Sequence, residues 1–358
     1  MMNWKKWIAI GLMVCVLLSG CTEQRRAAQQ MLENSQQKDS YESTSFAMDT
    51  VMTFHIIHPD GETLLIDAEQ EVKRLEKLFS VTQKDSDIQK INDNAGKEAV
   101  SVSADTLALL QAGKQLGKAT HHTFDIAIYP IVKAWGFTES NYTVPTQETL
   151  NELLPLTKAE DITIDTDAST VYLEQEGMAV DLGGIAKGYA SDKLAELLKK
   201  KGVKSAWLSL GGNVCAIGNK PDGSPWKIAV QNPSDENDYV GVVQISDACA
   251  VTSGGYQRYF EENGKKYHHI IDPATGKPAE SGLLSVTIVC ADGTKADALS
   301  TALYVMGLED ALAYWRTQKD FEAILVTEAG EVVATEGLQD SFTFEGKGND
   351  FTYRVEKR

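Results

Sequence analysis

The apolar positions of the chain follow two periods, which predict helices and strands in different segments. Apolar residues recur at helical spacing over 67–79, and again in a helix that Ser103 caps and that runs to about Leu116. The segment 51–57 has the apolar and β-branched character of a strand. Short strands follow one another in quick succession between residues 205 and 290. Such runs of neighbouring strands favour an α+β fold over a doubly wound parallel sheet.

Three further helices and one central strand are predicted in the second half of the chain. A helix enters at Gly184 and runs to about Lys201, where a glycine follows it. Helices over 295–306 and 308–318 are separated by a single glycine. The segment 283–290, "LLSVTIVC", is the most apolar of the predicted strands. We therefore expect it in the middle of a sheet.

The N-terminal segment 1–20 has the layout of a bacterial lipoprotein signal peptide. Lys5 and Lys6 precede an apolar run that is too short for a comfortable membrane span. The run ends in "LSGC", which resembles the lipobox, where the cysteine is acylated and becomes the new N-terminus. We expect Cys21 to carry lipid and to anchor the exported protein to the outer side of the bacterial cytoplasmic membrane, or to a periplasmic membrane face.

The rest of the chain divides into a tether and one folded unit. Residues 21–44 are rich in glutamine, serine and charge, so we expect a flexible tether there. Residues 45–358 are long enough to bury a large core and are expected to form one domain of two lobes. Loss of Lys5 and Lys6 with the signal changes the formal net charge from −17 to −19. Such an acidic surface argues against nucleic acid as a partner and against electrostatic adhesion to anionic lipid.

Neither the cysteines nor the paired histidines form a recognised metal motif. Cys215, Cys249 and Cys290 lack metal-ligand spacing, which leaves buried free thiols or one disulfide among them. His121 and His122 are adjacent, so their side chains diverge, and no third ligand is expected within reach. No GxSxG elbow occurs, so a serine hydrolase is not expected.

Two glycines and a lysine mark the start of one predicted helix, in "VDLGGIAKGYASDKL" over 180–194. Gly183 and Gly184 would let the backbone approach a ligand closely, and the exposed amides at a helix start favour an anion. Lys187 would add an ammonium group beside a phosphate. The pattern alone is equally compatible with tight packing of the helix against a sheet.

Two carboxylates stand out as candidate chemistry. Asp297 and Thr301 are four residues apart on a predicted helix and project from the same face. A carboxylate with a hydroxyl suits Mg²⁺, whereas the alternative is an acidic residue near a helix start with a threonine bonded to its own helix. Asp125 lies in the apolar segment "FDIAIYPIVKAWGF", so its carboxylate needs a partner.

Seven segments, taken together and in order, resemble the ApbE family, the FAD:protein FMN transferases, over roughly residues 45–335. They are "MDTVMTF", "FDIAIYPIVKAWGF", "VDLGGIAKGYASDK", "LGGNVCAIG", "SGGYQRYF", "HHIIDPATGKP" and "ADALSTALYVMG". The resemblance implies a T-fold-like α+β architecture, with mixed antiparallel sheets flanked by helices and an FAD cleft between two lobes. It also implies an Mg²⁺-dependent reaction in which FAD is split at its pyrophosphate, AMP leaves, and FMN is joined to a threonine or serine of an acceptor protein.

The resemblance also implies roles for individual residues. Mg²⁺ would be held by Asp297, Thr301 and the carbonyl of Gly184, and the pyrophosphate by Lys187 and helix amides. Asp181 would place a ribityl or ribose hydroxyl. His269 and Asp272 would face the nucleotide or the incoming threonine, with His269 or a nearby carboxylate as general base, or with no base at all. The flavin or adenine pocket would be lined by Met48, Phe79, Ser80, Thr123, Phe124 and Asp125.

Three functions remain open for such a chain. The first is transfer of FMN to an exported or membrane-bound redox protein, such as a component of a Na⁺-pumping quinone reductase or an extracellular electron-transfer lipoprotein. The second is hydrolysis of FAD to FMN and AMP by an Mg²⁺-dependent pyrophosphatase. A lipoprotein that binds FAD without chemistry is the third reading, and the pairing of Asp297 with Thr301 argues against it.

Overall fold

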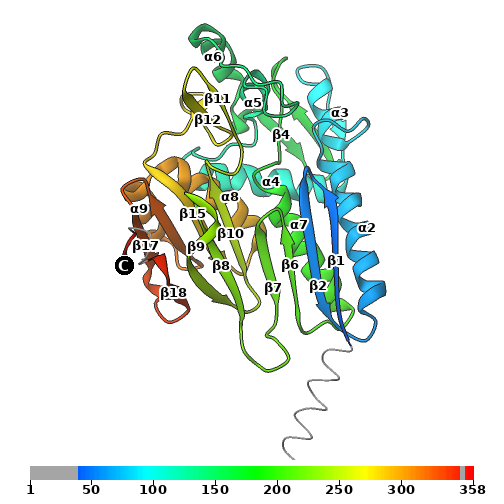
Figure 1. Ribbon diagram of the computed structural model, residues 1–358. Helices are drawn as coiled ribbons and strands as arrows, with labels where there is room; N and C mark the ends of the chain where they lie inside the picture. Colours follow the sequence, from blue (N-terminus) through cyan, green and yellow to red (C-terminus); the bar gives the residue numbers. More distant parts are fainter. Residues whose placement is uncertain (1–38, 347–350) are drawn as a thin grey trace, which may run out of the picture.

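A nine-stranded sheet forms the centre of the computed structural model, which describes residues 39–346 and 351–358 (Figure 1). Neighbouring strands pair antiparallel, except for the last pair, which is parallel. In spatial order the strands are β1 (Ser40–Ala47), β2 (Thr50–Ile57), β6 (Ala206–Leu210), β7 (Asn213–Ile217), β10 (Cys249–Gly254), β15 (Leu283–Cys290), β16 (Phe321–Thr327), β17 (Glu331–Thr335) and β19 (Thr352–Glu356). The antiparallel pairing and the interior position of β15 confirm the predicted α+β class and the predicted central strand.

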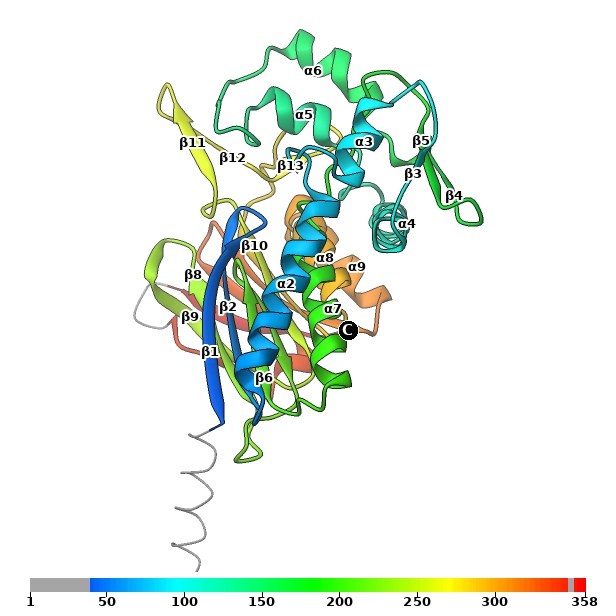
Figure 2. The same cartoon turned by 90° about the vertical axis from the view of Figure 1, so that its right-hand side faces the viewer.

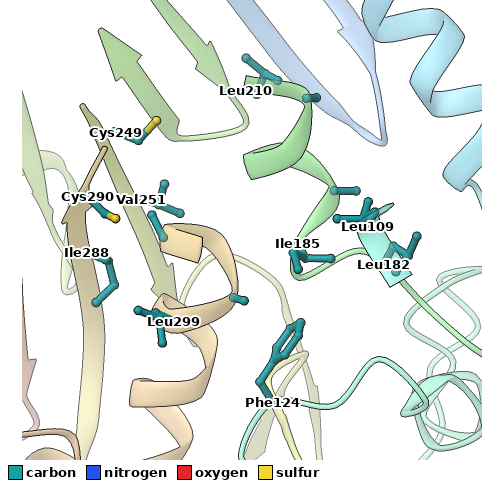
Figure 3. Packing of buried hydrophobic residues seen from close by; sticks show 14 of the residues in the cluster. Leu109, Phe124, Leu182, Ile185, Leu210, Cys249, Val251, Ile288, Cys290 and Leu299 are labelled. Atoms are coloured by element: carbon teal, nitrogen blue, oxygen red, sulfur yellow. The ribbon is translucent and has the colours of Figure 1, made fainter. Parts of the chain in front are cut away.

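Helices cover one face of this sheet (Figure 2). They are α2 (Gly61–Phe79), α7 (Ala186–Lys200), α8 (Gly293–Met306) and α9 (Leu308–Thr317), and α4 (Ala104–Ala119) packs against α2 and α8. Their apolar faces share one core with the inward side chains of the strands. Figure 3 shows part of this core, with Leu299 of α8 beside Val251 of β10 and Ile288 of β15. The helix layer therefore fixes where α7 and α8 stand relative to the strands.

A smaller sheet covers the opposite face. Its strands are β18 (Phe342–Phe344), β9 (Asp235–Ile245) and β8 (Trp226–Asn232), in that order. The side chains of β16 alternate between the two cores, because Leu325 faces the helices while Ile324 and Val326 face the smaller sheet. The unbroken apolar run "AILV" in β16 follows from burial on both faces.

A second layer lies above the ends of the strands, at the top of Figures 1 and 2. It contains α3 (Asp87–Asp93), α5 (Tyr129–Ala134), α6 (Gln147–Leu153), the sheet β3 (Val100–Ser101), β5 (Thr170–Leu173) and β4 (Ile162–Asp165), and the hairpins β11 (Tyr259–Glu262) with β12 (Lys265–His268) and β13 (Ile271–Asp272) with β14 (Lys277–Pro278). Short 3₁₀ turns lie at Leu154–Leu156, Ala159–Asp161 and Glu336–Leu338. A separate aromatic core joins α5, α6 and the hairpins, with Phe260 stacked on Tyr267 and Tyr142. Helix α3 and the sheet β3–β5–β4 pack against the main core instead.

The structure differs from the sequence predictions at several boundaries. Strand β1 begins at Ser40, so part of the expected tether 21–44 belongs to the sheet. Helix α2 begins at Gly61, six residues before its predicted start, because Leu64 and Leu65 also face the core. The signal segment, Cys21 and most of the tether lie outside the described residues. Within the described residues, no helix is long and apolar enough to cross a membrane.

Three cysteines, Cys215, Cys249 and Cys290, lie side by side on adjacent strands. Cys249 of β10 is in register with Cys215 of β7 on one side and with Cys290 of β15 on the other. Cys215 and Cys249 form a disulfide, and Cys290 is a buried free thiol. The sequence allowed either buried free thiols or one disulfide, and the structure has one of each.

Candidate functional site

One cavity of about 2380 Å³ collects every predicted site residue that the structure describes. Ligand pockets usually measure roughly 300–1,000 Å³, so this cavity has room for a dinucleotide and a second reactant. Its walls come from the strand ends and helices below and from α5, α6 and the hairpins above. This arrangement is the predicted cleft between two lobes. The predicted residues in its lining are Met48, Phe79, Ser80, Thr123, Phe124, Asp125, Asp181, Gly184, Lys187, His269, Asp272, Asp297 and Thr301.

The glycine turn before α7 faces the cavity rather than the sheet. A Cβ on Gly184 would lie 3.1 Å from the ring of Phe124 and 3.8 Å from the hydroxyl oxygen of Thr301. Lys187 extends its ammonium group to 3.2 Å from the carbonyl oxygen of Gly183. Close packing occurs at Gly188 instead, and against helix α8 rather than a sheet, because a Cβ there would lie 2.1 Å from the carbonyl oxygen of Gly293. Gly183 and Gly184 are therefore available to a ligand.

Asp181 stabilises this turn. Its Oδ1 accepts a hydrogen bond of 2.7 Å from the backbone N–H of Gly183. Burial raises the pKa of Asp181, while that hydrogen bond and the charges of Lys187 and Arg258 act in the opposite direction. The carboxylate therefore lies within the field of two cations at the pyrophosphate end of the predicted site.

Asp297 and Thr301 project into the cavity from one face of α8. Asp297 is only 3% exposed, and its Oδ2 accepts a hydrogen bond of 2.8 Å from the backbone N–H of Gly188. No basic side chain pairs with it among residues 39–346 and 351–358. This buried carboxylate has no cationic partner there and lies next to a hydroxyl and a glycine turn. Such a donor set suits a hard divalent cation such as Mg²⁺.

The hydroxyl group of Thr301 contacts a chain of two further hydroxyl groups. The Oγ of Ser253 lies 3.2 Å from the Oγ1 of Thr301 and 2.7 Å from the Oγ of Ser300. Ser253 also lines the cavity. Its contact with Thr301 joins residues 48 positions apart, so helical spacing within α8 could not reveal it.

The backbone fixes the tautomer of His269, and burial keeps the ring neutral. Its Nδ1 lies 3.1 Å from the carbonyl oxygen of Arg258, and a carbonyl can only accept, so Nδ1 carries the proton. Nε2 is then the unprotonated nitrogen, and it has no hydrogen-bond partner in the described part of the chain. Burial lowers the pKa of His269 to about 4, and the nearby charges of Arg258, His268 and Lys187 act in the same direction.

The carboxylates of Asp272 and Asp125 accept hydrogen bonds mainly from nearby backbone and side-chain groups. The two oxygens of Asp272 accept from the N–H of Ala274 and the hydroxyl of Thr275, which closes the turn after β13. Asp125 accepts from the backbone N–H groups of Ala127 and Ala159, and burial raises its pKa. Both residues line the cavity, and their predicted contacts to the nucleotide stay predictions.

His122 has more partners than its sequence suggested. Its Nε2 lies 2.9 Å from Glu160, and its Nδ1 lies 3.9 Å from Asp125. One ligand atom from each of the three residues falls within 4.8 Å of the others. The expectation that no third ligand lies within reach was therefore wrong, because Glu160 is brought in by the 3₁₀ turn that Asp125 anchors.

The mouth of the cavity is formed by the β1–β2 turn and the β10–β11 loop. Met48 has a φ of 49° there, and its N–H donates to Glu76 of α2 at 2.7 Å. Asp49 in the same turn lies 3.9 Å from the guanidinium of Arg258. The sequence analysis gave no role to Glu76 or Arg258, although Arg258 lies within the segment "SGGYQRYF" that carries the family resemblance.

The comparisons with known proteins agree with this fold and with the family resemblance. The model of the ApbE family matches residues 48–325. An FAD:protein FMN transferase of Klebsiella pneumoniae is 34% identical over 278 residues, which cover 77% of this chain and 86% of that protein. The ApbE protein of Thermotoga maritima superposes with a TM-score of 0.77 at 34% identity, over 83% of this chain and 97% of the other. The flavin transferase ApbE of Vibrio cholerae gives 0.73 at 28% identity, over 86% and 97%.

Fold, cavity and relatives together define the protein as an enzyme of the same kind as these transferases. The chain belongs to the ApbE family.

Proposed function

We propose that the protein transfers FMN from FAD to a threonine or serine hydroxyl of another protein, with Mg²⁺ as the required ion and AMP as the leaving group. One observation carries the proposal: Asp297, Thr301, Gly184 and Lys187 share a cavity with the neutral base His269. Anion-binding, cation-binding and proton-accepting groups are the three that this reaction needs. The names of the relatives supply the flavin substrate.

The start of α7 would bind the pyrophosphate. Its amides carry the positive end of the helix dipole, and Lys187 adds a full charge within the first turn of the helix. Bound at Asp297, Thr301 and the carbonyl of Gly184, Mg²⁺ would neutralise charge that develops on the phosphoryl oxygens. Together these groups would position the phosphates for attack by the acceptor, and positioning with charge neutralisation supplies most of the catalysis in phosphoryl transfer.

His269 would take the proton of the acceptor hydroxyl. The hydroxyl oxygen forms a bond to the phosphorus of the FMN half, the pyrophosphate P–O bond breaks, and AMP leaves with its electron pair. The proton passes to Nε2, which is unprotonated because Nδ1 donates to Arg258. Water in place of the hydroxyl would give free FMN and AMP.

The partner would be an exported or membrane-bound redox protein. Two large apolar side chains in the cavity lining, Phe46 and Tyr259, are 67% and 42% exposed, which suits contact with a protein surface. The lipobox at Cys21 supports a lipid anchor on the outer face of the bacterial membrane. The Cys215–Cys249 disulfide supports an oxidising compartment.

Product analysis tests the proposal. The mature lipoprotein in detergent is mixed with FAD, Mg²⁺ and an exported flavin-accepting domain, and nucleotides are separated by chromatography. The account expects AMP in equal amount to FMN lost from solution onto the acceptor, and neither product with EDTA. AMP with an equal amount of free FMN would establish the pyrophosphatase, and intact FAD would leave only a binding protein.

A further inference from the structure

Helices α7 and α8 touch along two matched rows of residues. The row that leads into and along α7 is Gly184, Gly188 and Asp192, and the row on α8 is Gly293, Asp297 and Thr301. Each row has a spacing of four residues, so its members lie one above another on one face. The rows run in opposite directions and meet in three contacts, of which the first is Gly184 beside Thr301, in the cavity.

The second contact joins backbone to carboxylate. The N–H of Gly188 donates to Oδ2 of Asp297 at 2.8 Å. A Cβ on Gly188 would lie 2.7 Å from Cβ of Asp297 and 2.1 Å from the carbonyl oxygen of Gly293. The two helices therefore approach as closely as glycine allows, and Asp297 can turn only one oxygen toward the cavity.

The third contact is made by Asp192, at the far end of the rows. Its Oδ1 accepts from the N–H of Gly293, and its Oδ2 accepts from both the N–H and the hydroxyl of Thr294, at 2.6–2.8 Å. These are the orphan amides of the first turn of α8, where a carboxylate also has a favourable interaction with the helix dipole. Asp192 does not line the cavity and touches none of the predicted metal ligands.

We propose that Asp192 is a positioning residue that fixes α8 against α7 and thereby sets the geometry of the metal ligands. This inference rests on the proposed function, since it concerns the Mg²⁺ site of that reaction. Three charge-assisted bonds at one end of α8 resist both sliding and rotation of the helix along α7. Asp297 and Thr301 lie one and two turns further on, so a shift of α8 moves both relative to Gly184.

Direct metal binding tests the inference apart from turnover. The full chain in detergent is titrated with Mn²⁺, a substitute for Mg²⁺, and the free ion is followed by electron paramagnetic resonance. Asp297→Ala should abolish this binding, which identifies the site being titrated. Asp192→Asn replaces one acceptor oxygen by an NH₂ group that opposes the donors of α8. We expect its Mn²⁺ dissociation constant to rise about tenfold, with unchanged FAD binding in the absence of metal.

Asp105→Asn is the matched control. Asp105 of α4 accepts from Arg74 and from Tyr189 of α7 and pairs with Lys193, so it too ties α7 to a neighbour, but not to α8. It should lower the melting temperature and leave the Mn²⁺ affinity unchanged. A milder variant, Thr294→Val, removes only the hydroxyl bond to Asp192 and should weaken Mn²⁺ binding about two- to threefold.

The outcomes separate the inference from the proposed function. If Asp192→Asn loses stability as Asp105→Asn does but keeps wild-type Mn²⁺ affinity, Asp192 is merely structural and the inference is wrong. If Asp192→Asn does not fold, an unchanged affinity in Thr294→Val overturns it. A wild type that binds Mn²⁺ but transfers no FMN contradicts the proposed function alone, whereas a wild type without Mn²⁺ binding overturns both.

Discussion

The pH dependence of the reaction follows from the state of His269. An ordinary histidine has a pKa near 6.5, so at pH 6 roughly a quarter of it is neutral and able to accept a proton. Burial lowers the pKa of His269 to about 4. At pH 6 nearly all of it is then already neutral.

This difference sets the expected rates. With an ordinary histidine as the base, kcat/KM for FAD, which reports the pKa of the free enzyme, would rise about fourfold between pH 6 and pH 8. With His269 it should stay constant within experimental error over that range and fall only as the pH approaches 4. His269 accepts a proton only when it is unprotonated. A lower pKa therefore extends the pH range of constant rate toward acidic pH.

The assay is FMN transfer at limiting FAD and saturating Mg²⁺, which gives kcat/KM, measured in overlapping buffers from pH 4.5 to 8.5. His269→Gln should lower the turnover number by about 10²–10³, a typical contribution of a general base, and leave FAD binding in place. His268→Gln is the control, because the Nε2 of His268 is committed to the carbonyl oxygen of Ala279. A rate that falls steadily below pH 7 in the wild type, or a fully active His269→Gln, would refute the assignment.

Three further predictions concern the metal, the helix contact and the acceptor. Asp297→Ala should abolish turnover and weaken FAD binding without eliminating it, as measured by flavin fluorescence titration; full activity with Mg²⁺ would contradict the metal assignment. Gly188→Ala should destabilise the fold by about 1–3 kcal/mol in urea unfolding, because its methyl group would meet the carbonyl oxygen of Gly293; an unchanged midpoint would contradict the close contact. Phe46→Ser should raise the KM for the acceptor protein and not for FAD, whereas Ile66→Ser, at a 53% exposed position on α2 outside the cavity lining, should change neither; equal effects would remove Phe46 from the acceptor surface.

Local patterns predicted the parts of the site that depend on local geometry. Asp297 and Thr301 share a face of α8 because four residues make about one helical turn, and the sequence alone shows that spacing. The glycine turn before α7 was predicted from two glycines and a lysine at the start of a helix. Only the structure distinguishes ligand binding from close packing at this turn. Gly184 lies at the cavity, whereas the close packing occurs at Gly188, against α8.

Contacts between distant segments could not be predicted from one sequence. The support of Thr301 by Ser253 and the hold of Asp192 on α8 join residues 48 and more than 100 positions apart, and both depend on how the elements pack. The Cys215–Cys249 disulfide likewise depends on the register of β7 against β10. Strand β1 was missed because its half-buried serines and its exposed threonine, at a sheet edge, resemble the composition of a linker.

Mass spectrometry of the acceptor protein tests the central claim most directly. The acceptor is digested after reaction with the mature enzyme, FAD and Mg²⁺, and the modified residue is identified by fragmentation. The account predicts one FMN in phosphoester linkage to a single threonine or serine, absent with EDTA and absent with Asp297→Ala. An acceptor that stays unmodified while FAD is consumed, or one that is modified equally by Asp297→Ala, would contradict it.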